Sequence, residues 1–399
     1  MTPPPVTPLR VSLDATAVPA RPGGAGRYVL NLAGELAGPG LGDGDGDGAG
    51  EGVGGPGFEV TVLCRQGDRA RWEDRAGAAR VVGVAPSRRP LRLAWEQAAL
   101  PRLLGRIAVD VHHGPHYTMP LAARGPSVVT VHDLSFFSHP EWHQPAKVAF
   151  FRGAIRVAAA RAAAIVAVSH ATAERLDART RPRGQVHVIP HGVDHARFRP
   201  AATSEEEEAD VRARQRLGIE RGRPYVAFVG TLEPRKDVPS LVRAFDLIAA
   251  GHPDTLLVLA GQRGWGVDAV EAAIVTARAR DRVTLAGYVT EEENVALLRG
   301  AAVVAYPSLE EGFGLPALET MACGTPLVTT SGSAMEEVAG TAALLVAPGD
   351  AVGLAEALEA TLAGGTDVEE RRRLGIVVAD RHRWSTTARA HVEVYRSVV

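Results

Sequence analysis

Short runs of Val, Ile, Leu and Ala recur along the chain at regular intervals. In the first half they cover residues 10–15, 58–64, 127–133, 163–169 and 185–190. In the second half they cover residues 224–230, 255–261, 282–288, 302–308 and 326–332. Apolar runs of this length are typical of strands that are buried on both faces of a parallel sheet.

The stretches between these runs have helical spacing, as in residues 145–164, and the alternation of the two patterns predicts βα units. A polar interval beginning at Thr203 separates the two series. The sequence therefore predicts an α/β protein with two doubly wound, Rossmann-like domains that meet near residue 198. Ligands of such sheets bind beyond the carboxyl ends of the strands, so the loops after the strands are where we look for chemistry.

Composition narrows the class of protein. The chain has 399 residues and a formal net charge of −2, which disfavours a nucleic-acid-binding protein. The balance hides an asymmetry, because basic residues exceed acidic ones by six up to Arg197 and acidic residues exceed basic ones by eight after it. Two cysteines, no apolar run of about 18 residues and no basic-apolar start predict a reduced, cytoplasmic protein without a disulfide scaffold, leader or membrane span.

Much of the glycine lies in residues 38–57, where 11 of the 20 residues are Gly. Such a segment cannot bury enough apolar surface to order itself, so we expect a flexible insertion. Its Asp-Gly run beginning at Asp43 resembles a calcium loop, but the twelfth position, which should be Glu, is Gly54.

The first strand leads into a glycine loop in which Gly23, Gly24 and Gly26 precede a helix expected to begin near Arg27. Backbone amides at such a turn favour an anion, although a tight turn that packs helix on sheet explains the glycines equally well. A dinucleotide fingerprint would need Gly at Val29 and an acidic residue at the end of the second strand, where Cys64 and Arg65 stand.

The strand over residues 224–230 opens into Arg235 and Lys236. Only two of the 44 basic residues are lysines, so a lysine beside an arginine indicates a point charge next to a planar fork, as in a clamp for a diphosphate. An exposed pair at the start of a helix is the alternative.

The strongest signal follows the strand over residues 302–308. Glu311 precedes the glycine loop Gly312-Phe313-Gly314, and Glu319, eight positions after Glu311, lies in the expected first helical turn. Loop amides can donate to an anion and the two carboxylates can accept from sugar hydroxyls, whereas either Glu alone would be explained as a partner of the helix dipole.

Histidines supply the remaining candidates. His132 and Asp133 end a central strand and suggest acid/base chemistry, although a hydrogen-bonded packing histidine is common there. His112, His113 and His116 invite a metal site, but no carboxylate or cysteine accompanies them at helical spacing, so we expect no metal.

Taken together, five segments resemble the family 4 retaining glycosyltransferases of the GT-B fold. They are GGAGRY from Gly23, VHD from Val131, IPHGVDHARFRP from Ile189, GTLEPRKD from Gly230 and EGFGLPALETMACGTPLV from Glu311. The final helix, residues 385–399, is similar to the family helix that crosses back to the first domain. The resemblance implies an acceptor-side domain of residues 1–198 joined by that helix, and a nucleotide-sugar domain of residues 199–384. Asp237 departs from the family pattern, which often has Asn there.

The resemblance also implies roles. The donor would be a nucleoside-diphosphate sugar, mannose-like as a first choice, bound in the cleft between the domains. Glu311 and His132 would contact the transferred sugar as the catalytic residues. The donor-binding groups would be Gly24, Arg235, Lys236, Phe313, Gly314, Leu315 and Glu319. No metal or other cofactor would be needed, because fixed cations and helix-end amides would stabilise the charge on the leaving diphosphate. No protein nucleophile would be needed either, because the leaving phosphate oxygen would take the proton of the acceptor during same-face attack.

Alternatives stay open at this point. The chain could be a nucleotide-sugar epimerase or phosphorylase on the same frame, or a nucleotide-sugar-binding protein that has lost catalysis. The acceptor would be a glycan or a glycolipid. Lys147, Arg152, Arg156 and Arg161 could line one helix face and make a peripheral contact with the inner face of a membrane, although an ordinary solvated face is the commoner case.

Overall fold

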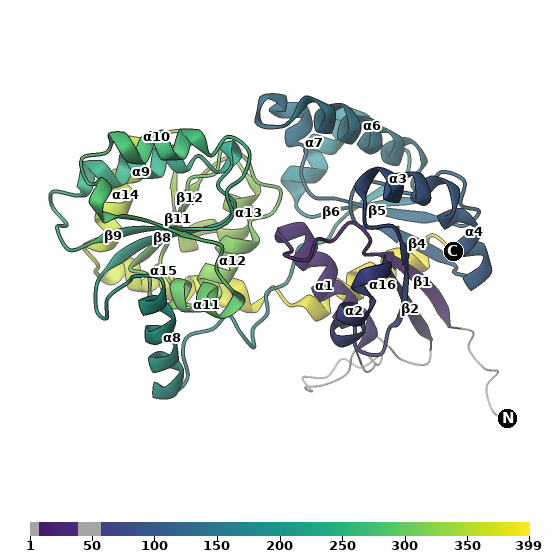
Figure 1. Ribbon diagram of the computed structural model, residues 1–399, viewed down its shortest axis with the longest axis horizontal. Coiled ribbons are helices and arrows are strands. Elements are labelled where there is room, and N and C mark those ends of the chain that lie inside the picture. Colours follow the sequence, from purple (N-terminus) through teal and green to yellow (C-terminus); the bar gives the residue numbers. More distant parts are fainter. Residues whose placement is uncertain (1–7, 39–56) are drawn as a thin grey trace. The chain divides into compact units, whose positions relative to one another are not determined.

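The computed structural model describes residues 8–38 and 57–399, so the expected glycine-rich insertion lies almost wholly outside the described residues. The chain divides into two compact units (Figure 1). Unit 1 comprises Met1–Phe137, Pro145–Gly192 and Trp384–Val399, and unit 2 comprises Ser138–Gln144 and Val193–Arg383. The short segment Ser138–Gln144 therefore packs with unit 2 although it interrupts the chain of unit 1.

Unit 1 is built on a parallel sheet of seven strands in the order β3-β2-β1-β4-β5-β6-β7. The strands are β1 (Leu9–Asp14), β2 (Phe58–Arg65), β3 (Arg80–Ala85), β4 (Val111–Gly114), β5 (Ser127–Val131), β6 (Ala164–Ala167) and β7 (Gln185–Val188). The helices are α1 (Gly24–Ala37), α2 (Arg69–Arg75), α3 (Arg89–Ala98), α4 (Leu100–Ile107), α5 (Ser135–Ser138), α6 (Pro145–Arg161), α7 (His170–Thr180) and α16 (Trp384–Ser397). Helices α6 and α7 cover one face of the sheet, and α1 and α16 lie against the other (Figure 1).

Unit 2 repeats the plan with six parallel strands in the order β10-β9-β8-β11-β12-β13. The strands are β8 (Tyr225–Val229), β9 (Leu256–Ala260), β10 (Val283–Gly287), β11 (Val303–Tyr306), β12 (Leu327–Thr330) and β13 (Ala343–Val346). The helices are α8 (Ser204–Arg216), α9 (Val238–Ile248), α10 (Asp268–Thr276), α11 (Glu291–Gly300), α12 (Leu315–Ala322), α13 (Ala334–Ala339), α14 (Ala351–Leu362) and α15 (Thr366–Asp380), with the short 3-10 helix η3 at Pro234–Lys236. Two doubly wound sheets confirm the predicted fold class.

Details of the elements differ from the sequence prediction. Helix α1 begins at Gly24 rather than near Arg27, and α6 ends at Arg161 because Ala164 already belongs to β6. The polar interval at Thr203 is the start of α8, whose first turn is acidic and whose last turn is basic. That arrangement suits the helix dipole, and the Thr203 side chain caps the helix by accepting from Glu206 N at 3.2 Å.

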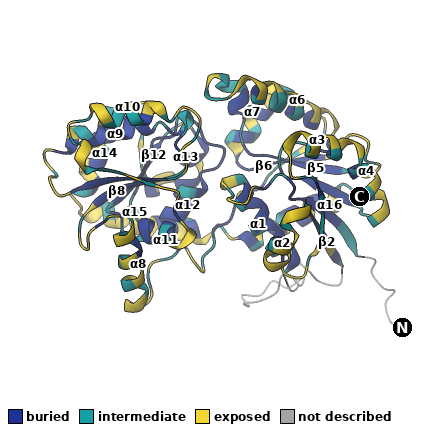
Figure 2. Cartoon of the chain, viewed as in Figure 1, coloured by how far each residue is buried: buried dark blue, intermediate teal, exposed yellow. Residues whose placement is uncertain are grey.

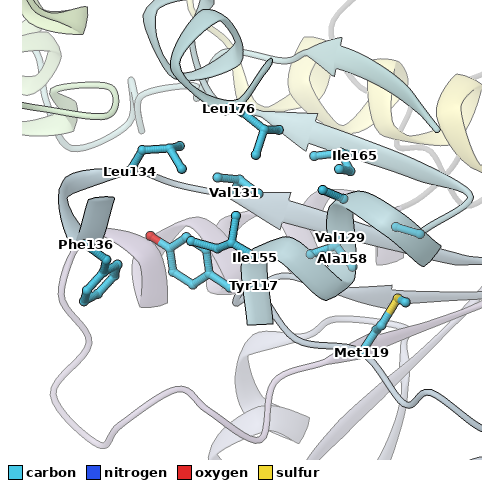
Figure 3. Packing of buried hydrophobic residues seen from close by; sticks show 12 residues of the cluster. Tyr117, Met119, Val129, Val131, Leu134, Phe136, Ile155, Ala158, Ile165 and Leu176 are labelled. Carbon is cyan, nitrogen blue, oxygen red and sulfur yellow. The ribbon is translucent and has the colours of Figure 1, made fainter. Parts of the chain in front are cut away.

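The apolar core of unit 1 lies between β5, β6 and helices α6 and α7 (Figure 3). Val131, Ile155 and Leu176 are fully buried there, and Figure 3 shows them close together between the sheet and the helices. The strands are mostly buried, and the outer helices have one buried and one exposed face, as expected (Figure 2). No helix within residues 8–38 and 57–399 has the length and apolar character needed to cross a bilayer.

The opposite face of the same sheet is held by a buried chain of hydrogen bonds that ends in α16. His391 Nδ1 lies 2.7 Å from the Thr387 carbonyl, which can only accept, so Nδ1 carries the proton and Nε2 must accept. Tyr28 therefore donates to His391 Nε2 at 2.7 Å and accepts from Thr130 Oγ1 at 2.9 Å.

The same argument fixes the donor and acceptor of each remaining hydrogen bond in this network. Thr130 Oγ1, having given its proton to Tyr28, accepts from His113 Nε2 at 2.8 Å, and His113 Nδ1 then accepts from the Tyr395 hydroxyl at 2.8 Å. Both histidines must be neutral for this arrangement to hold. Helix α16 thus packs on unit 1 through a hydrogen-bond network in which each proton has a single position, and also through its apolar face.

Acidification should destabilise unit 1. Burial lowers the pKa of His391 and of His112 to about 4 and that of His113 well below its usual value, whereas an unfolded histidine titrates near 6.5. Between pH 6.5 and 4 the unfolded chain therefore binds more protons than the folded one, so stability rises with pH in this window and is lost as pH falls through it.

We expect calorimetry to show a markedly lower Tm for unit 1 at pH 5.5 than at pH 7.5, with several protons taken up on unfolding. His391→Gln keeps an acceptor for Tyr28 and removes one titrating group, so it should reduce that uptake by about one proton. A Tm that does not change between these pH values would contradict the prediction.

Candidate functional site

The main candidate residues of unit 2 lie where the order of its strands reverses. Strands β8 and β11 are neighbours, but the chain runs outward from β8 to β9 on one side and from β11 to β12 on the other. The turn with Arg235 and Lys236 follows β8, and the loop with Glu311 follows β11. The carboxyl ends of two such strands bound the usual ligand crevice of a doubly wound sheet, which brings the two strongest motifs of the sequence together.

Glu311 lies between the two cations. Its Oε2 accepts from Arg235 Nη1 and its Oε1 accepts from Lys236 Nζ. All three side chains are largely buried, with 9% of the Glu311 side chain, 17% of Arg235 and 11% of Lys236 exposed. Burial alone would raise the pKa of Glu311, but the charges of Arg235 and Lys236 outweigh it and lower the pKa to about 2.

The backbone around the Arg235 turn is bound to the loop after β11. Leu309 N donates to the Arg235 carbonyl at 2.8 Å, and Arg235 Nη1 donates to the Glu310 carbonyl at 3.1 Å. Arg235 Nη2 also donates to Glu233 Oε1 at 2.9 Å. The position of the guanidinium is therefore set from several sides, and an anionic ligand would have to exchange for carboxylates that already neutralise the cations.

A second contact holds the same turn from the side of β9. Leu232 N donates to the Gln262 carbonyl at 2.9 Å and Gly264 N donates back to Leu232 O at 3.0 Å. A Cβ at Gly264 would lie 2.8 Å from Leu232 O, so this close approach of the two loops requires glycine. Asp237, which ends the turn, has φ +44°, a left-handed conformation that both Asp and Asn tolerate. Its replacement of the usual Asn therefore leaves the turn intact.

The glycine loop after Glu311 leads directly into α12. Gly314 caps the helix with φ +100°, and Pro316 lies in its first turn as expected. Glu319 is the fifth residue of α12 rather than part of its first turn, which contains no acidic residue. A simple role as a dipole partner in the first turn therefore does not explain Glu319, whose side chain is buried with 2% exposed.

Phe313 and Leu315 flank Gly314 and are each 5% exposed. The predicted donor amides therefore belong to a tightly packed loop and helix start. Ala317 N and Leu318 N both donate to the Gly314 carbonyl, at 2.9 and 3.2 Å, which closes the first turn of α12.

His132 directly follows β5 in unit 1 and is 8% exposed. Its Nε2 lies 2.8 Å from the Pro115 carbonyl, so Nε2 carries the proton and Nδ1 is left as an acceptor. Burial lowers its pKa, which keeps the ring neutral near pH 7. Asp133 is turned to Ser135, whose N and Oγ both donate to Asp133 Oδ1, so the structure shows Asp133 capping α5 rather than orienting His132.

The three glycines in the loop before α1 of unit 1 fall into two groups. A Cβ at Gly26 would meet Pro22 Cβ at 2.7 Å, so this glycine is needed for packing. Gly23 and Gly24 have open space around a Cβ, and both are exposed. Packing therefore does not account for these two glycines, which leave the start of α1 uncovered.

Within residues 8–38 and 57–399, no group of three or more His, Cys, Asp or Glu side chains is placed to hold a metal ion. His112 instead contacts Ser12 Oγ at 2.9 Å. Both cysteines, Cys64 and Cys323, are buried free thiols.

Family models match the two units separately. Residues 211–378 match the model described as glycosyl transferases group 1, and residues 51–197 match the model described as glycosyltransferase family 4. The chain is 27% identical over 297 residues to O-antigen chain mannosyltransferase B of Escherichia coli, covering 72% of this chain and 74% of that protein.

The chain belongs to the family 4, group 1 glycosyltransferases.

A further relative of this glycosyltransferase is the D-inositol 3-phosphate glycosyltransferase of Nocardia farcinica, 32% identical over 228 residues, or 54% of this chain and 48% of that protein. The chain thus spans about half the length of that relative. Among solved structures, sucrose-phosphate synthase from Thermosynechococcus elongatus has a TM-score of 0.76 at 22% identity and covers 98% of each chain. The Anabaena protein HepE in complex with UDP-glucose has a TM-score of 0.74 at 18% identity and covers 98% of this chain and all of that one. These structures support the GT-B fold.

The structure adds residues that the sequence reasoning missed. Glu310, 4% exposed, accepts from Ser138 Oγ at 2.8 Å, and His139 lies 3.9 Å from the same carboxylate. The doublet of Glu310 and Glu311 was visible in the sequence, but nothing there indicated that the segment with Ser138 would pack with unit 2. On α6, Arg152 donates to the Phe136 carbonyl, and the guanidinium groups of Arg152 and Arg156 both lie over the Phe137 ring, so two of the four predicted surface cations already have partners in the fold.

We expect Gly314→Ala to cost more stability than an ordinary glycine replacement. Alanine at φ +100° is strained by about 1–3 kcal/mol, and its Cβ would meet Met335 Cγ at 2.8 Å. Gly349→Ala is the matched control, because Gly349 has φ +79° but no atom within 4 Å of a Cβ. Urea denaturation should show the larger loss for Gly314→Ala, and equal losses would show that Met335 moves aside freely.

Proposed function

We propose that this glycosyltransferase moves a hexosyl group, with mannose as the first candidate, from a nucleoside-diphosphate sugar to a glycan or glycolipid acceptor. Transfer proceeds with retention at the anomeric carbon and without a metal ion. The observation that carries the proposal is the pairing of Arg235 and Lys236 with Glu311 at the carboxyl ends of β8 and β11. Two fixed cations beside the start of a helix suit the leaving group of such a donor.

In this proposal the donor diphosphate takes over the contacts that Glu311 makes in the free protein. Arg235 provides a planar fork for two phosphate oxygens, and Lys236 provides a point charge. Amides at Phe313, Gly314 and Leu315 add donors along the positive end of α12. The displaced Glu311 carboxylate then accepts from hydroxyls of the transferred sugar, and Glu319 accepts from the ribose.

The reaction follows from these contacts. The acceptor oxygen forms a bond to the anomeric carbon on the face from which the diphosphate leaves, and the bond between that carbon and the phosphate oxygen breaks. The acceptor proton passes to the departing phosphate oxygen, so no protein nucleophile is needed. Negative charge grows on the diphosphate as the bond breaks, and cations already in place stabilise it without rearrangement.

Unit 1 supplies the remaining roles in the proposal. Neutral His132 presents Nδ1 as an acceptor for a hydroxyl of the transferred sugar, which an imidazolium could not do. The uncovered amides at Gly23 and Gly24 add donors for the leaving group. The relatives support the classes of substrate: one is named for mannosyl transfer to O-antigen chains, another for transfer to D-inositol 3-phosphate, and HepE was solved with UDP-glucose.

Thermal shift against GDP-, UDP-, dTDP- and ADP-sugars tests the donor. A ligand at 100 times its dissociation constant stabilises by about 2.7 kcal/mol, so one nucleotide should raise the Tm clearly above the others. Transfer of labelled sugar from that donor should persist in EDTA. Binding without transfer to a broad acceptor panel would favour a binding protein, and isomerised or phosphorolysed donor would favour an epimerase or phosphorylase.

The variant Glu311→Gln separates nucleotide binding from sugar transfer. Removing the carboxylate frees both cations from a competitor, so the variant should bind the bare nucleoside diphosphate at least as tightly as the wild type while turnover falls about 100-fold or more. Lys236→Ala should instead weaken nucleotide binding about tenfold or more, and Lys147→Ala, at the other lysine of the chain, should change neither. Titration calorimetry and transfer assays check both, and weaker nucleotide binding by Glu311→Gln would contradict the exchange.

A further inference from the structure

The loop between β1 and α1 has a buried base and an exposed tip. Ala15, Thr16 and Val18 are at most 1% exposed, whereas Pro19 and the residues at Gly23 and Gly24 face solvent. The base is attached to the sheet, because Ala15 N donates to the Leu63 carbonyl at 2.8 Å and Thr16 N donates to Asp14 Oδ1 at 2.8 Å. Beyond Thr16, the loop is held mainly by side chains from other elements.

Arg65, the last residue of β2, reaches this loop with both ends of its guanidinium. Its Nε donates to the Thr16 carbonyl at 3.1 Å and its Nη2 donates to the Val18 carbonyl. Asp68 lies 3.3 Å from the same Nε and fixes the side chain, which is 21% exposed. One residue of β2 therefore holds two carbonyl groups of the loop, those of residues 16 and 18.

Two further arginines complete the contact. Arg71 on α2 donates to the Pro19 carbonyl at 2.9 Å. Arg92 on α3 donates to Thr16 Oγ1 at 3.3 Å and to Glu96 Oε2 at 3.3 Å, and Glu96 is itself 2% exposed. We call Arg65, Arg71 and Arg92 the arginine brace.

The arginine brace gives a role to Arg65, to which the sequence alone assigned none. The end of β2 is the position from which a dinucleotide fold usually recognises a ribose, and there an acidic side chain faces the ligand. Arg65 occupies this position but bonds to the protein's own backbone, so its charge is used inside unit 1. Charged donors to carbonyl groups are among the stronger hydrogen bonds in proteins, and three of them converge on four residues of loop.

We propose that the arginine brace consists of positioning residues for the transfer reaction: it fixes the loop from Thr16 to Pro19 so that the amides at Gly23 and Gly24 keep a constant place. The inference rests on the proposed function, in which these amides assist the departing diphosphate. Gly23 is the N-cap and Gly24 the first residue of α1, so an anchor a few residues before them limits how the loop enters the helix and where these amides lie.

Arg65→Met tests this proposal, since it keeps the aliphatic stem and removes the donors. Arg10→Met is the matched control: Arg10 lies at the other end of β1, is also partly exposed and also pairs with an acid, Asp110, at 3.4 Å. Arg71→Met is a milder second variant, because it removes one contact at the exposed side of the loop. Arg65→Lys restores a cation with fewer donors.

Two readouts are measured on the whole protein: hydrogen exchange of the amides in residues 16–24, and release of GDP from GDP-mannose, or of the matching diphosphate if another donor gives the thermal shift. We expect Arg65→Met to speed loop exchange and to lower kcat about tenfold at unchanged Tm of unit 2. Arg71→Met should act in the same direction by about threefold, and Arg65→Lys should recover part of the loss. Arg10→Met should lower the Tm of unit 1 without either effect.

The outcomes separate the brace from the proposed function. Unchanged loop exchange in Arg65→Met and Arg71→Met would overturn the brace. Faster exchange with unchanged kcat would overturn the positioning role, as would an equal loss of kcat in Arg10→Met. A wild-type protein that releases no diphosphate from any nucleotide sugar would contradict the proposed function, and with it the positioning role, whereas loop exchange would still decide whether the arginines hold the loop.

Discussion

The pairing of the buried Glu311 carboxylate with Arg235 and Lys236 is the interaction on which the rest of the candidate site in unit 2 depends. A buried charge is costly unless it is paired, and here one acid and two cations would each be unfavourable without the others. Their mutual attraction fixes the loop after β11 against the turn after β8, since Arg235 of the turn also bonds to the backbone of Leu309 and Glu310 in that loop. The same pairing keeps two cations in a place from which water is largely excluded, so that they are ready for an anion before one arrives.

The two units solve the problem of holding a loop at a strand end in different ways. In unit 2 the turn after β8 lies against the loop after β9, and backbone hydrogen bonds between them require glycine at Gly264. In unit 1 the loop after β1 is bound by guanidinium groups instead. Backbone pairing needs residues without side chains, whereas arginine can reach a loop whose own residues are bulky. Both devices fix a loop at the carboxyl end of a strand.

Much of this could be predicted from the sequence, and the reasons are physical. Ten of the strands were visible because buried parallel strands have nearly unbroken apolar runs, but β4 was missed because His112 and His113 fill it, and the edge strands β3 and β13 were also missed, since exposed or half-buried residues interrupt their apolar runs. The motifs at Arg235 and Glu311 could be found because the types of residue in them indicate their chemistry. The direct contact between the two motifs could not be predicted, since only the strand order places β8 beside β11. The arginine brace was also invisible, because an arginine that binds backbone looks like any other in a chain with 44 basic residues.

The return of α16 to unit 1 has a consequence for how the protein is made. Tyr28 and His113 are synthesised before most of unit 2, but their hydrogen-bond partners His391 and Tyr395 are synthesised after all of it. All of unit 2 is translated in between. Unit 1 therefore lacks α16 beside α1 while unit 2 is made, and unit 2 can fold as soon as it emerges. Unit 2 is thus free to finish folding first, and unit 1 is completed only after α16 has been synthesised.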